Sequence, residues 1–291
     1  MPFRPNPNDT ITIADSTYIF SEHPAAPGMA YGQAGRRGTV YQLADAQGGL
    51  WALKVFLRQY CEPRLAGQAE RLQALAALPG LRAAERAVLT SSQHRALIRE
   101  NLDLAYAVQM PWISGRTWME VILSRELLPP LESLQRASAL AAALVGMEER
   151  GLAHCDLSGP NLILPPEGGV ELVDLEEMYG PELMKPEQLP GGSPGYAHRT
   201  APQGLWNSRA DRFSGAVLLA EMLGWCDERV VETAWGEGYF QPEEMSEESE
   251  RSRLLKKVLA ERWGQGPAEL FGRAWGADTL AMSPTFNEWA A

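Results

Sequence analysis

The chain carries an ordered series of polar motifs separated by apolar runs, and the spacing of these motifs limits the folds it can adopt. Lys54 lies within a strand-like apolar run, and the motif at 154–161 follows a long helical pattern directly. Asp174 ends a second apolar run, and the stretch 192–196 and Asp211 come after it. Taken singly, two aspartates and an asparagine indicate nothing. The specific signal is the spacing Asp-x4-Asn followed by an apolar strand that ends in aspartate.

The hydrophobic pattern divides the chain into a β-rich first part and an α-rich second part. Residues 1–27 predict an arm with one strand, and glycine-punctuated β-type sequence fills 29–56. A helix is expected over 68–78, because Leu72, Leu75 and Leu78 would share a face, and a strand over 106–110.

The second part carries longer helical patterns. They cover 131–150, with Gly151 as the C-cap, 209–223, and much of 231–289. Four tryptophans of the last segment are expected to be packing anchors: Trp235, Trp263, Trp275 and Trp289. The fold class is therefore predicted to be α+β, with a small β-rich lobe, a larger α-helical lobe and a cleft between them.

Composition narrows the class of partner and the compartment. The 291 residues carry a formal charge of −11, which argues against nucleic acid or an anionic membrane as a main partner. Cys61, Cys155 and Cys226 show no metal-binding spacing, as expected in a reducing compartment. The start of the chain lacks an apolar signal core, and the apolar stretch 137–147 is too short to span a bilayer. We expect a cytoplasmic protein.

In order and spacing, these motifs resemble the eukaryotic-like (Hanks-type) Ser/Thr protein kinases, and their departures are similar to a divergent bacterial-type subgroup. The resemblance covers about residues 28–290. It implies a bilobal kinase-like fold, with an N-terminal arm at 1–27, an N-lobe at 28–110, a hinge at 111–115 and a C-lobe at 116–291. The chain ends within a helical pattern. We therefore expect a further C-terminal domain or partner proteins.

The resemblance implies an ATP site in the first part of the chain. Gly35 and Gly38 match two of the three glycines of the kinase phosphate loop, whereas Gln33 stands in place of the first. Val40 would cover the adenine, and Lys54 would contact the α- and β-phosphates.

Two further elements of the kinase ATP site have counterparts here. Glu70 would pair with the phosphate-binding lysine, with Glu85 as a weaker candidate. At the hinge, Met110 would be the gatekeeper. The carbonyl of Pro111 and the N–H of Ile113 would bond the adenine, and proline keeps the carbonyl that this role needs.

The same resemblance implies the catalytic residues of the second part. Asp156 would be the catalytic base that orients the acceptor hydroxyl, and Asn161 and Asp174 would hold Mg²⁺, or Mn²⁺ in its place. Ser193 would hydrogen-bond Asp156 and shape the peptide-binding floor. Asp211 would bond the backbone of the catalytic loop or cap the helix that follows it.

Several positions depart from the kinase pattern. Cys155 replaces the arginine that binds a phosphorylated activation loop, so activity is expected not to require that phosphorylation. Ser158 replaces a lysine that neutralises the γ-phosphate, and Glu176 replaces the glycine after the metal-binding aspartate. The family's Ala-Pro-Glu motif reads His198-Arg199-Thr200, and Ser283 stands where the arginine partner of that glutamate is expected.

Three functions therefore stay open. The first is an ATP- and Mg²⁺-dependent protein kinase acting on Ser or Thr, although the residues that separate Ser/Thr from Tyr kinases are both missing after Asp156. The second is a nucleotide-binding pseudokinase that acts as a regulatory interaction module. The third is a kinase of small molecules, against which the stretch 192–196 and Asp211 argue.

Overall fold

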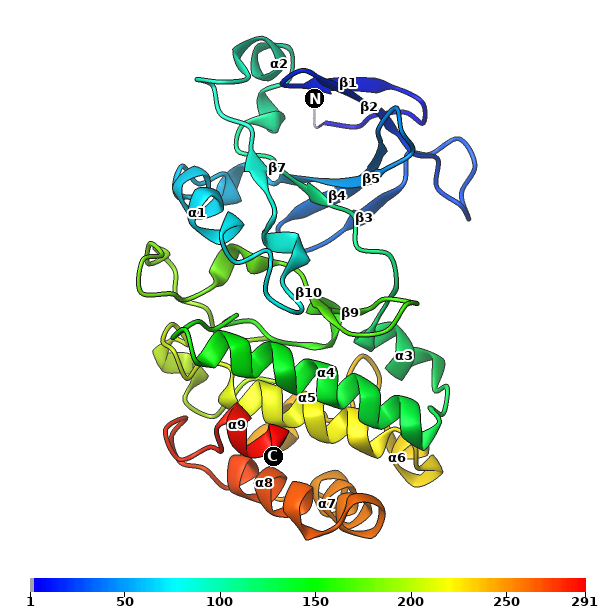
Figure 1. The fold of residues 1–291 in the computed structure, drawn as a ribbon, viewed down its shortest axis with the longest axis vertical. Helices are drawn as coiled ribbons and strands as arrows, with labels where there is room; N and C mark the ends of the chain where they lie inside the picture. The colour runs from blue at the N-terminus through cyan, green and yellow to red at the C-terminus, as the bar shows by residue number, and fades with distance from the viewer. Residues whose placement is uncertain (1–2) are drawn as a thin grey trace. The chain divides into compact units, whose positions relative to one another are not determined.

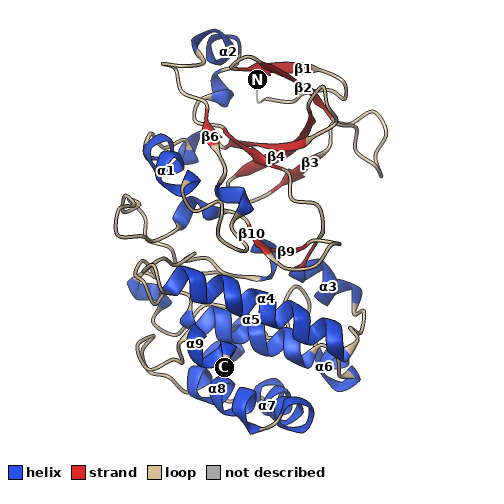
Figure 2. Ribbon diagram, in the orientation of Figure 1, coloured by secondary structure: helices blue, strands red, loops and turns tan. Residues whose placement is uncertain are grey.

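The chain consists of two compact units, which we describe separately from a computed structural model of residues 3–291. One unit comprises the chain up to Ala77 together with Arg82–Trp112, and the other comprises Leu78–Leu81 and Ile113–Ala291. The first is built on an antiparallel sheet and the second is mainly helical (Figures 1 and 2). The predicted α+β class is confirmed.

The first unit contains an antiparallel sheet of seven strands. In chain order the strands are β1 (Thr10–Ile13), β2 (Ser16–Phe20), β3 (Gly32–Ala34), β4 (Gly38–Ala44), β5 (Leu50–Phe56), β6 (Ala87–Val88) and β7 (Val108–Pro111). Their spatial order is β1-β2-β4-β5-β7-β6, and β3 also pairs with β4. Neighbouring β4 and β5 pair along their whole length, with Val40 opposite Lys54.

The N-terminal residues belong to this sheet, which corrects the expectation of an arm with one strand. β1 and β2 form a hairpin, and β2 pairs with β4 through Ile19 opposite Ala44 and Phe20 opposite Leu43. Every second residue of β1 is buried, as expected for a strand with one face on the core. The core beneath the sheet contains Phe20, Leu43 and Leu53 among its buried residues.

Two α-helices accompany this sheet. α1 (Arg64–Gln73) begins and ends earlier than the predicted helix over 68–78. Pro79 disfavours helical geometry at the residue before it, and the chain turns after Gln73. α2 (Arg95–Glu100) lies in the connection between β6 and β7, where Ile98 and Leu104 join the core.

The second unit is built around two long helices that lie side by side (Figure 1). α4 (Pro130–Glu148) begins with a proline at its first position and is followed by Gly151 at φ 65°, as predicted for the C-terminal glycine. α5 (Arg212–Gly224) is buried at every residue after Arg212. A helix that is apolar all round belongs in the centre of a core, and this explains its weak amphipathic pattern.

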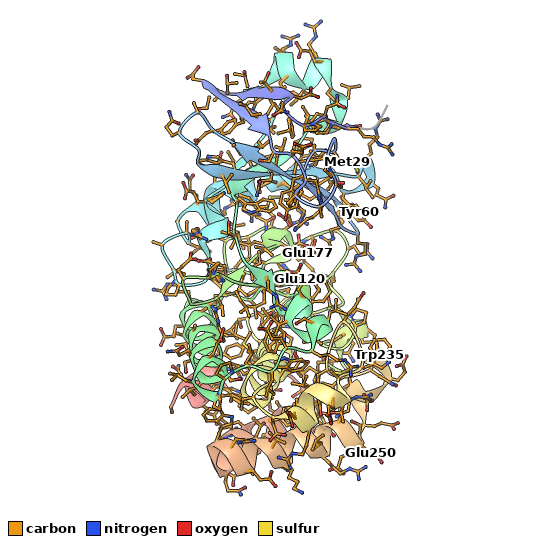
Figure 3. All side chains as sticks on the ribbon, turned by 90° about the vertical axis from the view of Figure 1, so that its right-hand side faces the viewer. Met29, Tyr60, Glu120, Glu177, Trp235 and Glu250 are labelled. Carbon is orange, nitrogen blue, oxygen red and sulfur yellow. The ribbon has the colours of Figure 1, made fainter. Side chains whose placement is uncertain are left out.

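The remaining elements of this unit surround the helical pair. They are α3 (Trp118–Ser124), α6 (Glu228–Thr233), α7 (Glu250–Trp263), α8 (Gln265–Trp275), α9 (Phe286–Ala290) and a three-stranded sheet of β8 (Arg116–Thr117), β9 (Leu162–Leu164) and β10 (Glu171–Leu172). Trp275 is buried, as predicted for a packing anchor, whereas Trp235 lies half exposed at the surface (Figure 3). Among residues 3–291, no helix has both the length and the apolar character needed to cross a bilayer.

Candidate active site

The loop that carries Asp156 is anchored by a buried carboxylate from α5. The backbone N–H of His154 donates to Asp211 at 2.5 Å, and the N–H of Cys155 donates to the other oxygen of Asp211 at 2.8 Å. Burial raises the pKa of Asp211, whereas the two amide donors favour its charged form. The predicted bond to the loop backbone is confirmed, and Asp211 makes no side-chain cap on α5.

His154 ties this loop to the strand end that precedes Asp174. Its ring Nε2–H donates to the carbonyl of Val173 at 2.8 Å, and Nδ1 accepts the backbone N–H of Asp156 at 3.3 Å. The side chain is fully buried. His154 is therefore a structural hydrogen-bonding residue, as its full burial requires.

Asn161 and Asp174 are held close to the same loop by the β9–β10 hairpin. The Asn161 amide nitrogen donates to the carbonyl of Asp156 at 2.8 Å, and the backbone N–H of Val173 donates to the carbonyl of Asn161 at 3.0 Å. Asp174 follows with φ 65°, an uncommon left-handed conformation for a residue other than glycine. Such a conformation, next to a bonded strand end, sets the direction of the Asp174 side chain.

Ser193 contacts Asp156 directly. Its hydroxyl donates to Asp156 Oδ1 at 2.8 Å, so the hydrogen bond predicted from the motif is present. The backbone N–H of Tyr196 donates to the carbonyl of Ser193 at 3.0 Å and closes the turn that contains Pro194. The structure thus brings four of the predicted residues, Asp156, Asn161, Asp174 and Ser193, into one connected network of loops.

The departures from the expected pattern have structural counterparts in this unit. Ser158 is fully buried, and its hydroxyl lies 3.4 Å from the carbonyl of Asp156. Cys155 is buried at φ 68°, and burial raises the pKa of its thiol far above the usual range, so it stays a neutral thiol. Glu176 is also buried.

The stretch that replaces Ala-Pro-Glu is attached to the C-terminal helices by other groups. The His198 Nε2–H donates to the carbonyl of Ala277 at 3.0 Å, and Arg199 donates to the carbonyl of Trp275 at 3.1 Å. Ser283, at the position of the missing arginine, is buried. These hydrogen bonds, together with an ion pair between Arg199 and the exposed carboxylate of Asp278, stand where the kinase pattern has a buried glutamate–arginine pair.

In the sheet unit, Lys54 lies on β5 between Val40 and Val108 in the strand register. Its side chain is only 5% exposed, and the ammonium lies 5.1 Å from the centre of the Phe56 ring. A buried lysine is uncommon and costs free energy unless it contacts an anion or a π face. The burial is evidence against a plain solvated strand lysine.

Of the two glycines at the β3–β4 turn, Gly38 permits a close approach between strands, and neither glycine has an unusual φ. Neither Gly35 nor Gly38 is among the glycines at positive φ. A Cβ on Gly38 would lie 2.2 Å from the carbonyl oxygen of Val55, whereas one on Gly35 would meet only the Gly38 oxygen at 3.7 Å. Gly38 is thus required by its neighbour strand, and Gly35 leaves the exposed turn backbone uncovered.

The structure does not support the predicted pairing of Glu70 with Lys54. Glu70 lies on the exposed side of α1, and its side chain makes no hydrogen bond or ion pair with any residue from 3 to 291. The buried stripe of α1 contains Leu65, Gln68, Ala69 and Leu72, and Gln68 accepts a hydrogen bond from Arg64 at 2.9 Å. A helix turns 100° per residue, so two positions suffice to exchange a buried face for an exposed one.

The residues predicted for the hinge lie at the end of β7 and just beyond it. Met110 is buried, and its sulfur lies 3.7 Å from a guanidinium nitrogen of Arg86. Pro111 stands opposite Trp51 in the sheet, and Ile113, the first residue of the helical unit after β7, is buried. Trp112 donates its backbone N–H to Leu50 at 3.1 Å.

Asn161 and Asp174 both carry oxygen atoms of the kind that a hard cation prefers. Asn161 donates its amide nitrogen to Asp156, which leaves its side-chain oxygen as the acceptor, and Asp174 adds a carboxylate. Oxygen ligands of this kind fit Mg²⁺ or Mn²⁺. Among residues 3–291, no cluster of three or more His, Cys, Asp or Glu side chains forms a complete metal site. Any ion held by Asn161 and Asp174 would thus keep waters or ligand oxygens in its shell.

No protein-family model matches this chain, and no curated protein matches its sequence.

Proposed function

We propose that the chain is an ATP- and Mg²⁺-dependent protein kinase that phosphorylates serine or threonine. The proposal includes a bilobal kinase-like fold, consistent with the α+β architecture, and a cytoplasmic setting. The observation that carries it is the hydrogen bond between Ser193 and Asp156, made on a loop whose amides are bonded by buried Asp211. This arrangement holds a carboxylate at fixed orientation beside a Gly/Pro-rich turn on which an acceptor peptide can rest.

In the proposed reaction, Asp156 accepts a hydrogen bond from the acceptor hydroxyl. The hydroxyl oxygen bonds to the γ-phosphorus, the bond from that phosphorus to the bridging oxygen of ADP breaks, and the hydroxyl proton passes to Asp156. Ser193 keeps the carboxylate oriented toward the acceptor. Lys54 would contact the α- and β-phosphates, while Asn161 and Asp174 would hold Mg²⁺, whose charge offsets that of the phosphate oxygens.

The first experiment measures γ-phosphate transfer from Mg-ATP to generic protein acceptors by intact mass. Asp156→Asn is expected to lower transfer at least a hundredfold while thermal stabilisation by Mg-ATP persists, because the variant loses the base and keeps the nucleotide contacts. Asp174→Ala should lose both transfer and that stabilisation. Full activity of Asp156→Asn would contradict the role of Asp156, and parallel assays with peptides and metabolites separate a protein kinase from a small-molecule kinase.

A nucleotide-binding pseudokinase is the second candidate, favoured by one pair of observations. Ser158 is buried where a γ-phosphate-binding lysine is expected, and Glu70 lies on the exposed side of α1. Both differences remove electrostatic stabilisation from the transfer step. If Mg-ATP stabilises the wild type against heat but no acceptor is phosphorylated, the pseudokinase is the better description.

A further inference from the structure

A buried carboxylate with no catalytic role in the proposed reaction lies in the middle of α5. Glu221 is 0% exposed, and three donors converge on it. The indole Nε1–H of Trp118 donates to Oε2 at 2.8 Å, the hydroxyl of Tyr196 donates to the same oxygen at 3.1 Å, and the backbone N–H of Tyr239 donates to Oε1 at 3.3 Å. These donors come from α3, from the stretch 192–196 and from the segment after α6.

The three neighbours select an acceptor-only group at this position. Indole and backbone N–H groups can only donate, and an ionised carboxylate can only accept, whereas a glutamine would direct its own NH₂ at one of the donors. The titratable groups that face Glu221 are Tyr196 and Tyr239, and among residues 3–291 no cation pairs with it. The carboxylate is therefore stabilised by hydrogen bonds alone, in a site where burial disfavours its charge.

Glu221 is connected to Asp156 through Tyr196. The Tyr196 hydroxyl bonds Glu221, its backbone N–H bonds the Ser193 carbonyl, and the Ser193 hydroxyl bonds Asp156. The tyrosine tip also packs on the catalytic loop, since a Cβ on Gly159 would lie 3.0 Å from the Tyr196 hydroxyl. Helix α3, which supplies Trp118, is itself fixed by a capping box between Thr117 and Glu120.

We propose that Glu221 is a positioning residue. Its ionised carboxylate holds Tyr196, and so keeps the stretch 192–196, on which an acceptor peptide can rest, and the Ser193–Asp156 hydrogen bond in place. The proposal rests on the proposed kinase function, and it adds a proton-dependent control of acceptor binding.

The protonation state of Glu221 changes within the physiological range. Burial raises the pKa of Glu221 to about 7. A protonated Glu221 presents an O–H to a ring of donors, so the Tyr196 hydroxyl must turn and accept, or lose its partner. Tyr196 is then held less firmly. Acceptor affinity should therefore be higher above pH 7 than below it.

The test measures KM for an acceptor protein and kcat from pH 6 to 8.5, at saturating Mg-ATP. In the wild type, KM should fall severalfold as pH rises through about 7. Glu221→Gln, which carries a donor at all pH values, should show a high KM without that step. Tyr196→Phe, which lacks the hydroxyl, should also give a high and pH-independent KM.

Tyr239→Phe is the matched control within the same cluster. It removes a hydroxyl bonded to the Arg251 carbonyl but keeps the backbone N–H that faces Glu221. The step in KM should persist in this variant. Thermal unfolding of each variant shows which ones fold. If Glu221→Gln does not fold, Tyr196→Phe still tests the hydrogen bond between Glu221 and Tyr196.

The outcomes separate this inference from the function on which it rests. If the wild type transfers phosphate and the step in KM remains in Glu221→Gln and Tyr196→Phe, the positioning role is wrong and the kinase proposal stands. If Tyr239→Phe also removes the step, the effect does not belong to the Glu221–Tyr196 link, and the inference is overturned. If no acceptor is phosphorylated at any pH, the kinase proposal and this inference fail together.

Discussion

At the scale of single residues, buried carboxylates organise the candidate site. Asp211 immediately precedes α5 and Glu221 lies within it, and neither forms an ion pair in the part of the chain that the structure describes. Each is satisfied by N–H or O–H donors from distant segments, as buried charges must be. The two residues therefore act as acceptors that hold loops in place, and substitutions that remove an acceptor are the informative ones.

Asp211→Asn should lower transfer at least a hundredfold through kcat, because one oxygen becomes an NH₂ that faces a backbone donor and the loop of Asp156 loses an anchor. We expect a loss of about 2–4 kcal/mol in the free energy of unfolding, measured by denaturant titration. Asp227→Asn is the control: Asp227 pairs with Arg229 and Arg262, away from the loop that carries Asp156. It should cost stability and spare kcat, and a similar loss of kcat in both variants would contradict the anchoring role.

Glu221 should make stability fall as pH rises. Its pKa is about 7 in the folded chain and 4.5 as the ordinary value, so between these values the folded state binds more protons than the unfolded state. The free energy of unfolding then decreases with pH, by about 3 kcal/mol in all across this window. Unfolding of the wild type and of Glu221→Gln between pH 4.5 and 7.5 measures the difference, and parallel profiles for the two proteins would show that Glu221 does not titrate there.

At the scale of elements, the spacing of residues along the chain predicts which elements form better than it predicts which way their side chains face. The Asp-x4-Asn loop and the strand before Asp174 are local features, and the structure shows a β hairpin between them. The face of α1 is set by packing. Gln68 lies on the buried stripe and Glu70 does not, although both follow from one helical pattern. The predicted helix begins four residues after the start of α1, and Leu75 and Leu78, which defined its predicted face, lie beyond the end of α1.

Gly38→Ala tests the close approach of β4 and β5. The added methyl would overlap the Val55 carbonyl, so we expect roughly 2–3 kcal/mol of destabilisation, or disruption of the strand pair. Gly35→Ala is the matched substitution at the same turn, since its methyl would meet only an oxygen at 3.7 Å. Thermal unfolding of both variants decides the matter, and equal melting temperatures would mean that the sheet relaxes around Gly38.

At the scale of the whole molecule, contacts between residues far apart in sequence connect the layers of each unit. In the sheet unit, the N-terminal hairpin completes a core that also contains Ile98 and Leu104 from the connection between β6 and β7. In the helical unit, Glu148 at the end of α4 accepts two hydrogen bonds. One comes from Arg212 Nε at 2.6 Å, and the other comes from the backbone N–H of Phe286 at 3.0 Å. One carboxylate thus joins α4, α5 and α9.

Glu148→Gln should therefore destabilise the helical unit by about 1–3 kcal/mol, because a partly buried guanidinium loses its counter-ion while the start of α9 loses an acceptor. Glu261→Gln is a suitable comparison, since its ion pair with Arg229 is exposed and screened by solvent, so its loss should change the free energy of unfolding less than Glu148→Gln does. Denaturant unfolding measures both. A larger loss in Glu261→Gln would contradict the importance assigned to burial.

The α+β class and the helices near 131–150 and 209–223 could be predicted from local periodicity, capping and spacing. The places where side chains meet could not, because they depend on contacts between distant segments. Asp211 lies 57 positions from His154, and Trp118 lies 103 positions from Glu221. Nothing local indicated which donors would face Glu221 or that residues 1–27 would extend the sheet. Local preferences act over a few residues, whereas burial and hydrogen-bond partners are set by segments that meet only in the folded chain.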